Sequence, residues 1–369
     1  MLKFSCEKAL LQLAVNTASR TVATKSSIPA LEGLLLEGTE VLTLSGYNMQ
    51  TGIRTRLEAD IREGGRIVLN SRLFGDIIRK MPDDVIVFSA DEKYMVTLTC
   101  GDTRFEILGL SADDYPEMPE VDDEYTFTMQ QGILKAMINQ TSFAVSTNEN
   151  RPIHTGSLFE VGIDGVTVVS VDGFRLALRR EKIEKLEGGA FRFVCPGSAL
   201  NEVEKICEDS EEPVIVMLGK RHIMFETGTT QLICRKLEGE FLDYKNAIPR
   251  NNPIRLTVDT KVMLSRLDRV SVVISEKLKS PVRCQMGNGS VVMSAKTGNG
   301  EAVDVCPVEG DGQELEIGFN NRYLMDALRY APAEQVVMEL NTGISPCVMT
   351  PVDGSDSFLY MVLPVRLKA

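Results

Sequence analysis

The sequence is poor in the residues and motifs that enzymes use for chemistry. Only two histidines occur in 369 residues, His154 and His222, and neither lies in a nucleophile motif such as GxSxG. There is no HExxH motif, no GxxxxGK[ST] loop and no complete GxGxxG, since Gly310-Asp-Gly312 lacks the third glycine. Acidic residues are plentiful, but no pair of carboxylates has a catalytic context that the sequence can reveal. We therefore expect no enzymatic activity and no cofactor.

Two further absences bear on metal binding and on the cellular compartment of the chain. The eight cysteines are scattered and the closest two are twelve positions apart, so no spacing fits a zinc site and buried reduced thiols are expected. No uninterrupted apolar stretch approaches the length of about 18 residues that a membrane span requires. Lys3, Glu7 and Lys8 interrupt any signal-peptide apolar region at the N-terminus. These features predict a cytoplasmic protein that does not enter a membrane.

Positive charge is also in deficit. The chain has 40 lysines and arginines against 52 aspartates and glutamates, which gives a net charge of −12. Taken alone, this balance argues against nucleic acid as a partner, because phosphates attract basic surfaces. The content of apolar residues (43%) and charged residues (25%) is otherwise ordinary for a globular protein. The length predicts two or three domains.

One pattern recurs six times along the chain. An apolar anchor in a short strand is followed six, seven and ten positions later by residues that share one face of a helix. All of these positions are apolar except Arg266, if tyrosine is counted as apolar. The anchors step by 63, 60, 66, 63 and 61 residues and are Phe4, Ile67, Phe127, Phe193, Leu256 and Ile317. The residue three positions after each anchor suits the end of a strand and the start of a helix: Glu7, Asn70, Gln130, Pro196, Asp259 and Asn320.

The repeated unit predicts an α+β fold built from six similar modules. Each module has a strand, a helix and further strands such as VIVFS (85–89) and VIVML (214–218), so helices should lie on one face of an antiparallel sheet. Copies one, three and five share a serine fifteen residues past the anchor, which pairs the six modules into three similar domains. We predict domains at residues 1–120, 121–248 and 249–369. A chance alignment of apolar residues is the alternative, and six nearly constant steps argue against it.

Several local stretches, in order and with similar spacing, resemble the family of bacterial DNA sliding clamps, the β subunits of the replicative DNA polymerase III. They are SIPALEGLLLE (27–37), SRLFGDIIRKMP (71–82), VSVDGFRLALRR (169–180), EGEFLDYKNAIP (238–249), EIGFNNRYLMDAL (316–328) and LPVRL (363–367). The resemblance implies the DNA clamp fold, in which each chain is half of a closed six-domain ring with helices around the hole. It implies a homodimer around duplex DNA that binds the polymerase III catalytic subunit, the clamp loader and other polymerases or repair proteins. A protein-interaction scaffold of the same fold that does not encircle DNA is the alternative.

The distribution of charge is compatible with an encircled duplex. The segments that we expect to be helical sum to +5, which leaves −17 for the rest of the chain. Weak phosphate contacts inside an acidic shell would permit sliding. Lys25 and the loop from Asn148 to Arg151 match family positions that touch DNA, and the other candidates depend on helix placement. The DNA-binding candidates are Arg20, Lys25, Arg72, Arg79, Lys80, Asn148 and Arg151.

The resemblance also implies a cleft for short linear peptides of partner proteins. By periodicity alone, VDGFRLALRR reads as a hairpin and MVLPVRLKA as a final edge strand. In the family these stretches converge on an apolar pocket, of a kind that takes leucine or phenylalanine anchors. One wall would be His154, Val171, Gly173, Phe174, Arg175, Leu176, Leu242 and Ala247, and the other Leu278, Asn320, Tyr323, Ile344, Pro346, Met361, Val362, Leu363, Pro364, Val365 and Arg366. The family often has threonine, histidine, proline and methionine where this chain has Val171, Phe174, Leu242 and Val365, so the preferred peptide is left open.

The dimer interface follows from the same resemblance. Arg104, Phe105 and Ile107 at an edge of the first domain would meet Val273 and Ile274 in the third domain of the other copy. An alternating apolar edge such as RFEIL is prone to pairing when exposed, which suits an edge that gains a partner strand.

Overall fold

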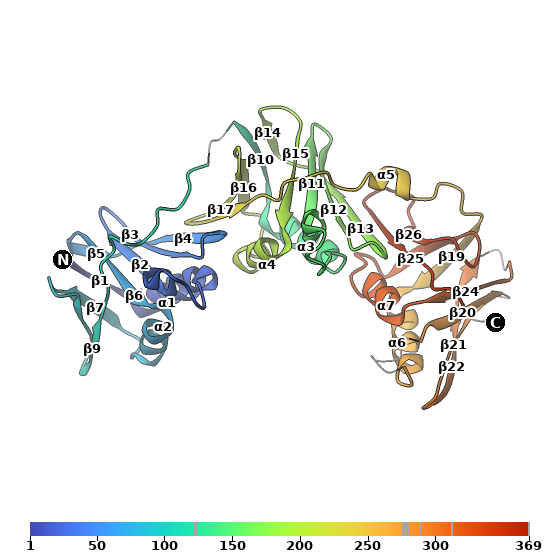
Figure 1. The fold of residues 1–369 in the computed structure, drawn as a ribbon, viewed down its shortest axis with the longest axis horizontal. Coiled ribbons are helices and arrows are strands. Elements are labelled where there is room, and N and C mark those ends of the chain that lie inside the picture. The colour runs from blue at the N-terminus through green and yellow to red at the C-terminus, as the bar shows by residue number, and fades with distance from the viewer. Residues whose placement is uncertain (122–123, 275–279, 288, 311–312, 368–369) are drawn as a thin grey trace. The chain divides into compact units, whose positions relative to one another are not determined.

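The structure is a computed structural model that describes residues 1–121, 124–274, 280–287, 289–310 and 313–367 (Figure 1). It divides into two compact units. The first contains Met1–Leu134, Glu184–Gly189 and Glu202–Lys236, and the second contains Lys135–Ile183, Ala190–Asn201 and Leu237–Ala369. Both units therefore include strands from the central third of the sequence.

The first unit contains two antiparallel sheets. A five-stranded sheet has the order β5-β1-β7-β8-β9, formed by Asp60–Glu63, Leu2–Glu7, Val85–Ala90, Met95–Cys100 and Thr103–Leu108. A nine-stranded sheet has the order β14-β10-β16-β17-β18-β4-β3-β2-β6, formed by Lys185–Glu187, Tyr125–Gln130, Pro213–Leu218, His222–Thr227, Thr230–Arg235, Thr51–Leu57, Leu42–Tyr47, Gly33–Gly38 and Gly65–Asn70.

The nine-stranded sheet of the first unit crosses the predicted domain boundary at residue 120. β18 pairs with β4 from Thr230, opposite Thr55, to Cys234, opposite Thr51. The hydroxyl groups of Thr55 and Thr230 lie 2.9 Å apart. Strands from the central part of the chain thus extend a sheet that the N-terminal part begins.

The helices of the first unit pack on each other through short apolar stripes. α1 (Lys8–Ala18) buries Leu11, and α2 (Ser71–Lys80) buries Phe74 and Ile78. Asn70 starts α2, because its side-chain oxygen accepts a hydrogen bond from the backbone N–H of Leu73 at 2.9 Å. Two short 3₁₀ helices, Ser19–Thr21 and Pro29–Glu32, follow α1.

The second unit repeats this plan with its own two antiparallel sheets. The nine-stranded sheet has the order β15-β11-β12-β13-β27-β26-β25-β19-β23, formed by Phe191–Pro196, Gly156–Gly162, Gly165–Val171, Arg175–Glu181, Phe358–Val362, Cys347–Pro351, Gln335–Leu340, Ile254–Asp259 and Glu309–Gly310. The four-stranded sheet has the order β22-β21-β20-β24, formed by Gly300–Pro307, Ser290–Thr297, Val282–Gly287 and Leu315–Phe319.

The C-terminal helices of the second unit cover one large core. α6 (Thr260–Ser271) and α7 (Asn321–Arg329) bury apolar side chains in the same cluster as the strands of this unit. Asp259 starts α6 by accepting a hydrogen bond from the backbone N–H of Val262 at 2.8 Å. The 3₁₀ helix Pro152–Thr155 and the short helix α5 (Tyr244–Ala247) also belong to this unit. α3 (Gln131–Ser142) and α4 (Gly197–Ile206) contribute residues to both units.

The sixfold strand-then-helix repeat is confirmed. Every anchor is buried in a strand that runs directly into a helix, in β1, β6, β10, β15, β19 and β24. The prediction for the position six residues after the anchor is wrong in three copies, because Leu10, Leu73 and Val262 are exposed. These helices bury the positions seven and eleven residues after the anchor, as with Leu11 and Val15, and the sixth position lies at the margin of that stripe.

Other sequence-based expectations concern thiols, membranes and metals. All eight cysteines are buried and in the thiol form, which confirms that prediction. In the part of the chain that the structure describes, no helix has the length and apolar character needed to cross a bilayer. Within the same residues, no three histidine, cysteine or acidic side chains are grouped so as to hold a metal ion.

Candidate functional site

A tight hairpin turn between β12 and β13 forms one side of the candidate site. The Oδ1 atom of Asp172 accepts hydrogen bonds from the backbone N–H groups of Phe174 (2.9 Å) and Arg175 (3.0 Å). Gly173 has a φ of +91°, which glycine adopts without the strain that a Cβ would cause. The turn leaves the Phe174 side chain 58% exposed. Asp172 therefore forms the turn of the hairpin predicted at VDGFRLALRR, and this turn presents an aromatic ring to solvent.

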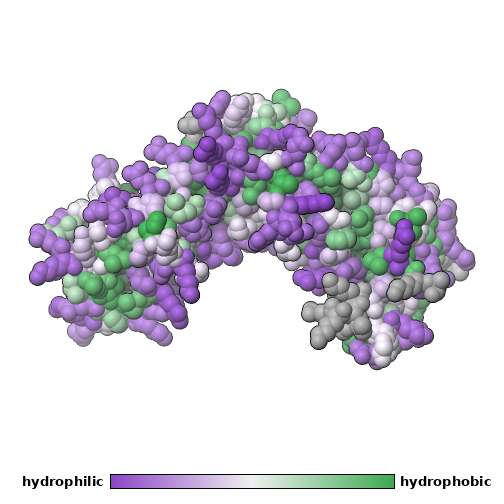
Figure 2. Space-filling model, viewed as in Figure 1, coloured by the Kyte–Doolittle hydropathy of each residue, from purple (hydrophilic) through white to green (hydrophobic). Residues whose placement is uncertain are grey.

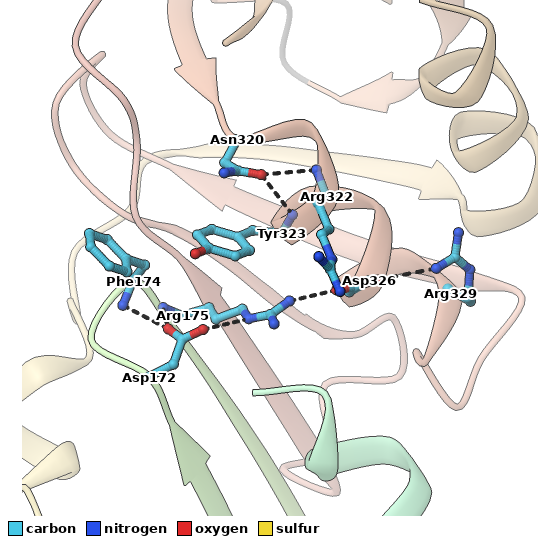
Figure 3. A network of polar contacts seen from close by, with 8 residues as sticks. All are labelled: Asp172, Phe174, Arg175, Asn320, Arg322, Tyr323, Asp326 and Arg329. Carbon is cyan, nitrogen blue, oxygen red and sulfur yellow. Dashed lines mark hydrogen bonds and ion pairs between the residues drawn. The ribbon is translucent and has the colours of Figure 1, made fainter. Parts of the chain in front are cut away.

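Burial, two ion pairs and an aromatic ring hold the charged side chain of Arg175 in place (Figure 3). Its side chain is only 10% exposed. Its Nε donates to Asp172 Oδ2 at 2.9 Å, and its Nη1 donates to Asp326 Oδ2 at 2.7 Å. Its guanidinium carbon lies 4.5 Å from the centre of the Tyr323 ring, a favourable cation–π distance. A buried cation needs such partners, and here it joins the hairpin to α7.

The N-terminal turn of α7 forms the facing side. Asn320 caps the helix, because its Oδ1 accepts hydrogen bonds from the backbone N–H groups of Arg322 (3.0 Å) and Tyr323 (3.3 Å). The rings of Tyr323 and Phe174 lie 6.1 Å apart at an angle of 23°. A cavity of about 640 Å³ adjoins this pair and is lined by Val145, Ser146, Thr147, Asn148, Asp172, Phe174, Arg175, Ile274, Asn320, Asn321, Arg322 and Tyr323. The arrangement offers aromatic faces and a few polar groups, as a peptide site requires.

The C-terminal segment runs along the hairpin and then along β24. β13 pairs with β27, which places Leu176 opposite Met361. The backbone N–H of Leu363 donates to the carbonyl of Phe174 at 2.8 Å, and that of Val365 donates to the carbonyl of Gly318 at 2.8 Å. Pro364 is half-buried, and both Val365 and Arg366 are exposed. The backbone thus fixes the tail beside the exposed aromatic ring.

The connector before β19 packs over the same sheet. Tyr244 donates a hydrogen bond from its hydroxyl to Glu160 at 2.5 Å, and burial together with this carboxylate raises the pKa of the tyrosine. Leu242 and Ala247 are exposed on this connector. His154 contacts Phe241 edge to face, with ring centres 5.5 Å apart.

The protonation of His154 follows from its surroundings. Burial lowers its pKa, and the nearby positive charge of Arg151 lowers it further. The imidazole is therefore neutral at pH 7, so His154 adds no charge to this wall.

Several predicted cleft residues are less accessible than the others. Val171, Leu176 and Met361 are buried in an apolar cluster beneath the connector, so they form a floor. Val362 is fully buried on the opposite face of its strand, in the core that includes α6 and α7, so it is closed to a ligand in this structure. Ile344 is exposed and Pro346 half-buried in the turn between β25 and β26. Leu278 lies outside the described residues.

Sequence reasoning missed the acidic and aromatic partners of Arg175. Asp326 was assigned no role, although it lies one helical turn after Tyr323 and is the only acidic residue of α7. Phe143, whose ring centre is 5.4 Å from the Arg175 guanidinium carbon, was also missed. One signal in the sequence could have indicated Asp326. It lies three residues after the predicted cleft residue Tyr323, and residues with this spacing share a helix face.

The DNA-binding candidates are mostly exposed side chains. In the first unit, Arg72, Arg79 and Lys80 lie exposed on α2, where Arg79 pairs with Asp76 at 3.0 Å. Arg20 is partly neutralised, because its Nη1 lies 3.6 Å from Glu202 Oε2. The remaining candidates, Lys25 in the first unit and Asn148 and Arg151 in the second, are exposed in loops.

The dimer candidates lie at a sheet edge and at a helix end. β9 is the outer strand of its sheet, with Arg104 exposed and Phe105 and Ile107 packed against the core of the first unit. Figure 2 shows apolar side chains over this sheet, among whose exposed residues is Leu108.

The second dimer candidate lies just beyond α6. Val273 and Ile274 are half-buried against the core of the second unit, whereas Val272 is 82% exposed. Val273 and Ile274 stay predictions for the dimer interface, and Val272 beside them is the apolar side chain most open to a partner in this segment.

Comparisons with known proteins assign the chain to a family. Models of the N-terminal, central and C-terminal domains of the DNA polymerase III beta subunit match residues 2–119, 128–243 and 245–366. The chain is 31% identical over 366 residues to a beta sliding clamp of Halalkalibacterium halodurans, covering 95% of this chain and 96% of that protein. The chain belongs to the DNA polymerase III beta subunit family.

Solved structures of beta subunits agree with this assignment over the whole chain. The DNA polymerase sliding clamp of Bacillus subtilis has a TM-score of 0.95 and 27% sequence identity, covering 100% of both chains. A putative beta subunit from Eubacterium rectale has a TM-score of 0.94 and 29% identity, again covering 100% of both chains. The beta-clamp fold predicted from the sequence is thereby confirmed.

Proposed function

We propose that the chain is a non-catalytic processivity factor that encircles duplex DNA as a head-to-tail homodimer. In this role it tethers the DNA polymerase III catalytic subunit, the clamp loader and other polymerases or repair proteins through their short linear peptides. Its domains would span residues 1–120, 121–248 and 249–369, so that two copies supply six domains to the ring. Membership of the beta-clamp family over nearly its whole length supports this role.

The observation that carries the proposal is a pair of edge strands, one in each unit, that have an open side. β9 ends the five-stranded sheet of the first unit, and β22 ends the four-stranded sheet of the second. β22 exposes Val303 and Val305. Among the described strands, none pairs with the outer side of β9 or of β22. Such edges tend to pair with another chain, and a head-to-tail dimer would satisfy both.

The cleft of the second unit supports the tethering role. Phe174 and Tyr323 offer two aromatic faces beside a cavity of about 640 Å³, while the capped turn at Asn320 and the buried charge of Arg175 orient polar groups. A peptide with leucine or phenylalanine anchors fits this chemistry, since aromatic pockets supply much of the energy at peptide interfaces.

The contact with DNA would be weak and independent of sequence. Exposed cations on α2 and in the loops at Lys25 and Arg151 are scattered within an acidic chain. Such a distribution favours enclosure over tight electrostatic binding. An interaction scaffold of the same fold that does not encircle DNA is the alternative. The charge balance of −12 is compatible with it, but the similarity to beta sliding clamps over nearly the whole chain does not favour it.

Primer extension on a circular template distinguishes these functions. The polymerase III catalytic subunit and clamp loader of the same cell extend a primer with and without the chain, with trap DNA to prevent rebinding. We expect the chain to lengthen the products of a single binding event when the loader and ATP are present. A scaffold that does not encircle DNA would leave the product length unchanged, and that result would contradict the proposal.

A further inference from the structure

Asp326 lies at the centre of the polar network behind the cleft. Its side chain is 12% exposed. Its Oδ2 accepts the hydrogen bond from Arg175 at 2.7 Å, and its Oδ1 accepts one from Arg329 Nη1 at 3.1 Å. Both carboxylate oxygens are engaged, so the carboxylate has a fixed orientation.

The two acidic partners of Arg175 differ in what they attach it to. Asp172 belongs to the same hairpin turn, three residues earlier, and moves with Arg175. Asp326 comes from α7, 151 residues later in the sequence. The carboxylate of Asp326 is therefore the ionic link between the guanidinium and the helix that carries Tyr323.

Arg175 lines two cavities within the second unit. The cavity beside Phe174 and Tyr323 has a volume of about 640 Å³. A second cavity has a volume of about 500 Å³, and Arg175, Asp326 and Arg329 are among its lining residues. Because this space is open, an arginine released from Asp326 has room to move away from the Tyr323 ring.

We infer that Asp326 is a positioning residue for the cleft: it holds the Arg175 guanidinium against the Tyr323 ring and thereby sets the spacing of the Phe174 and Tyr323 rings. An apolar peptide anchor would pack against those two rings, so their spacing determines the fit. The inference rests on the proposed function of the cleft. A planar guanidinium held at two points keeps one orientation, whereas one held only by Asp172 turns about that contact.

The first test compares two isosteric substitutions on neighbouring helices. Asp326→Asn removes the charge that holds Arg175. Asp268→Asn, on α6, removes an exposed acidic charge that lines the same 500 Å³ cavity. A fluorescein-labelled peptide from the DNA polymerase III catalytic subunit, containing leucine and phenylalanine anchors, serves as the probe in an anisotropy titration. We expect the Kd to rise about tenfold for Asp326→Asn and less than twofold for Asp268→Asn.

The second test reports on the aromatic pair without a peptide. The chain contains no tryptophan, so Phe174→Trp introduces a single tryptophan in the cleft, whose fluorescence is excited selectively over that of the tyrosines. We expect Asp326→Asn to increase acrylamide quenching of this tryptophan in the folded protein, and Asp268→Asn to leave quenching unchanged. A loss of stability alone would lower the melting temperature without altering quenching below the transition.

The outcomes separate this inference from the proposed function. If the unmodified chain binds the peptide and Asp326→Asn binds it equally well, the positioning role is contradicted. If the unmodified chain does not bind the peptide, the proposed cleft fails, and unchanged quenching would then overturn the positioning role as well. Should Asp326→Asn fail to fold, Asp326→Glu keeps the charge but displaces it by one methylene, and the same two measurements apply.

Discussion

The cap of α7 provides a quantitative link between local structure and ligand binding. Replacing Asn320 with alanine removes the oxygen that accepts from the backbone N–H groups of Arg322 and Tyr323. Loss of such a cap costs about 1 kcal/mol of stability. The first turn of α7, which carries Tyr323, then frays more often. Because about 1.4 kcal/mol corresponds to a tenfold change in Kd, capping alone can weaken peptide binding by no more than about fivefold.

The chain offers a matched control for this experiment. Asn70 caps α2 through an equivalent bond of 2.9 Å to the backbone N–H of Leu73. Asn70→Ala should therefore lower stability by about the same 1 kcal/mol without affecting the peptide. Calorimetry gives the stability of each variant, and an anisotropy titration gives the Kd.

A third variant separates capping from direct contact with the peptide. Asn320→Asp keeps an oxygen acceptor and adds a negative charge at a helix N-terminus, where it is favourable, so stability should be retained. If Asn320→Asp weakens binding as much as Asn320→Ala, the amide contacts the peptide and capping is not the cause. Unchanged stability in Asn320→Ala, or weakened binding in Asn70→Ala, would refute the reasoning.

Three further predictions test the dimer interface, the peptide cleft and the dependence of stability on acidic pH. Val272→Asp should convert the dimer to a monomer in sedimentation velocity, because an exposed apolar contact becomes charged, whereas Val41→Asp, at another exposed valine, should not. Removal of Leu363–Ala369 should abolish peptide binding and leave the dimer intact. Retained binding would show that this C-terminal segment is not part of the peptide site. Hydrogen bonds from two arginines lower the pKa of Asp304 to about 2, so this carboxylate stabilises the fold above about pH 4, and the contribution is lost as the pH falls through 2. In acid unfolding curves, the difference in stability between the unmodified chain and Asp304→Asn should shrink from about pH 4 to about pH 2. A difference that stays constant over this range would contradict the stabilising role of the Asp304 carboxylate.

The fold was largely predictable because the regular spacing of apolar residues reveals its repeat. A strand anchor followed by a helical stripe recurs six times, and the structure has a strand and a helix at each place. The error at Leu10 and Leu73 arises because an apolar residue at the margin of a stripe satisfies the same periodicity as one at its centre. Only packing against the sheet decides which of the two is buried.

The site was less accessible to sequence reasoning. The hairpin at Asp172 and Gly173 carries a local turn signal, and the resemblance to a family brought Phe174 and Tyr323 together. The ion pair between Arg175 and Asp326 joins residues 151 positions apart and leaves no periodic trace. The exposure of Val272 was equally hidden, because the sequence VVI after α6 does not indicate which of the three side chains faces outward.

Retention on DNA of different topology tests encirclement most directly. The chain is loaded on a nicked circular plasmid by its clamp loader, transferred to high salt and separated from free protein by gel filtration, before and after the plasmid is cut once. Encirclement predicts that the protein stays with the circle at high salt and is released from the linear DNA, because its grip is topological and not electrostatic. Equal loss of protein from the circle and from the linear DNA would contradict this account.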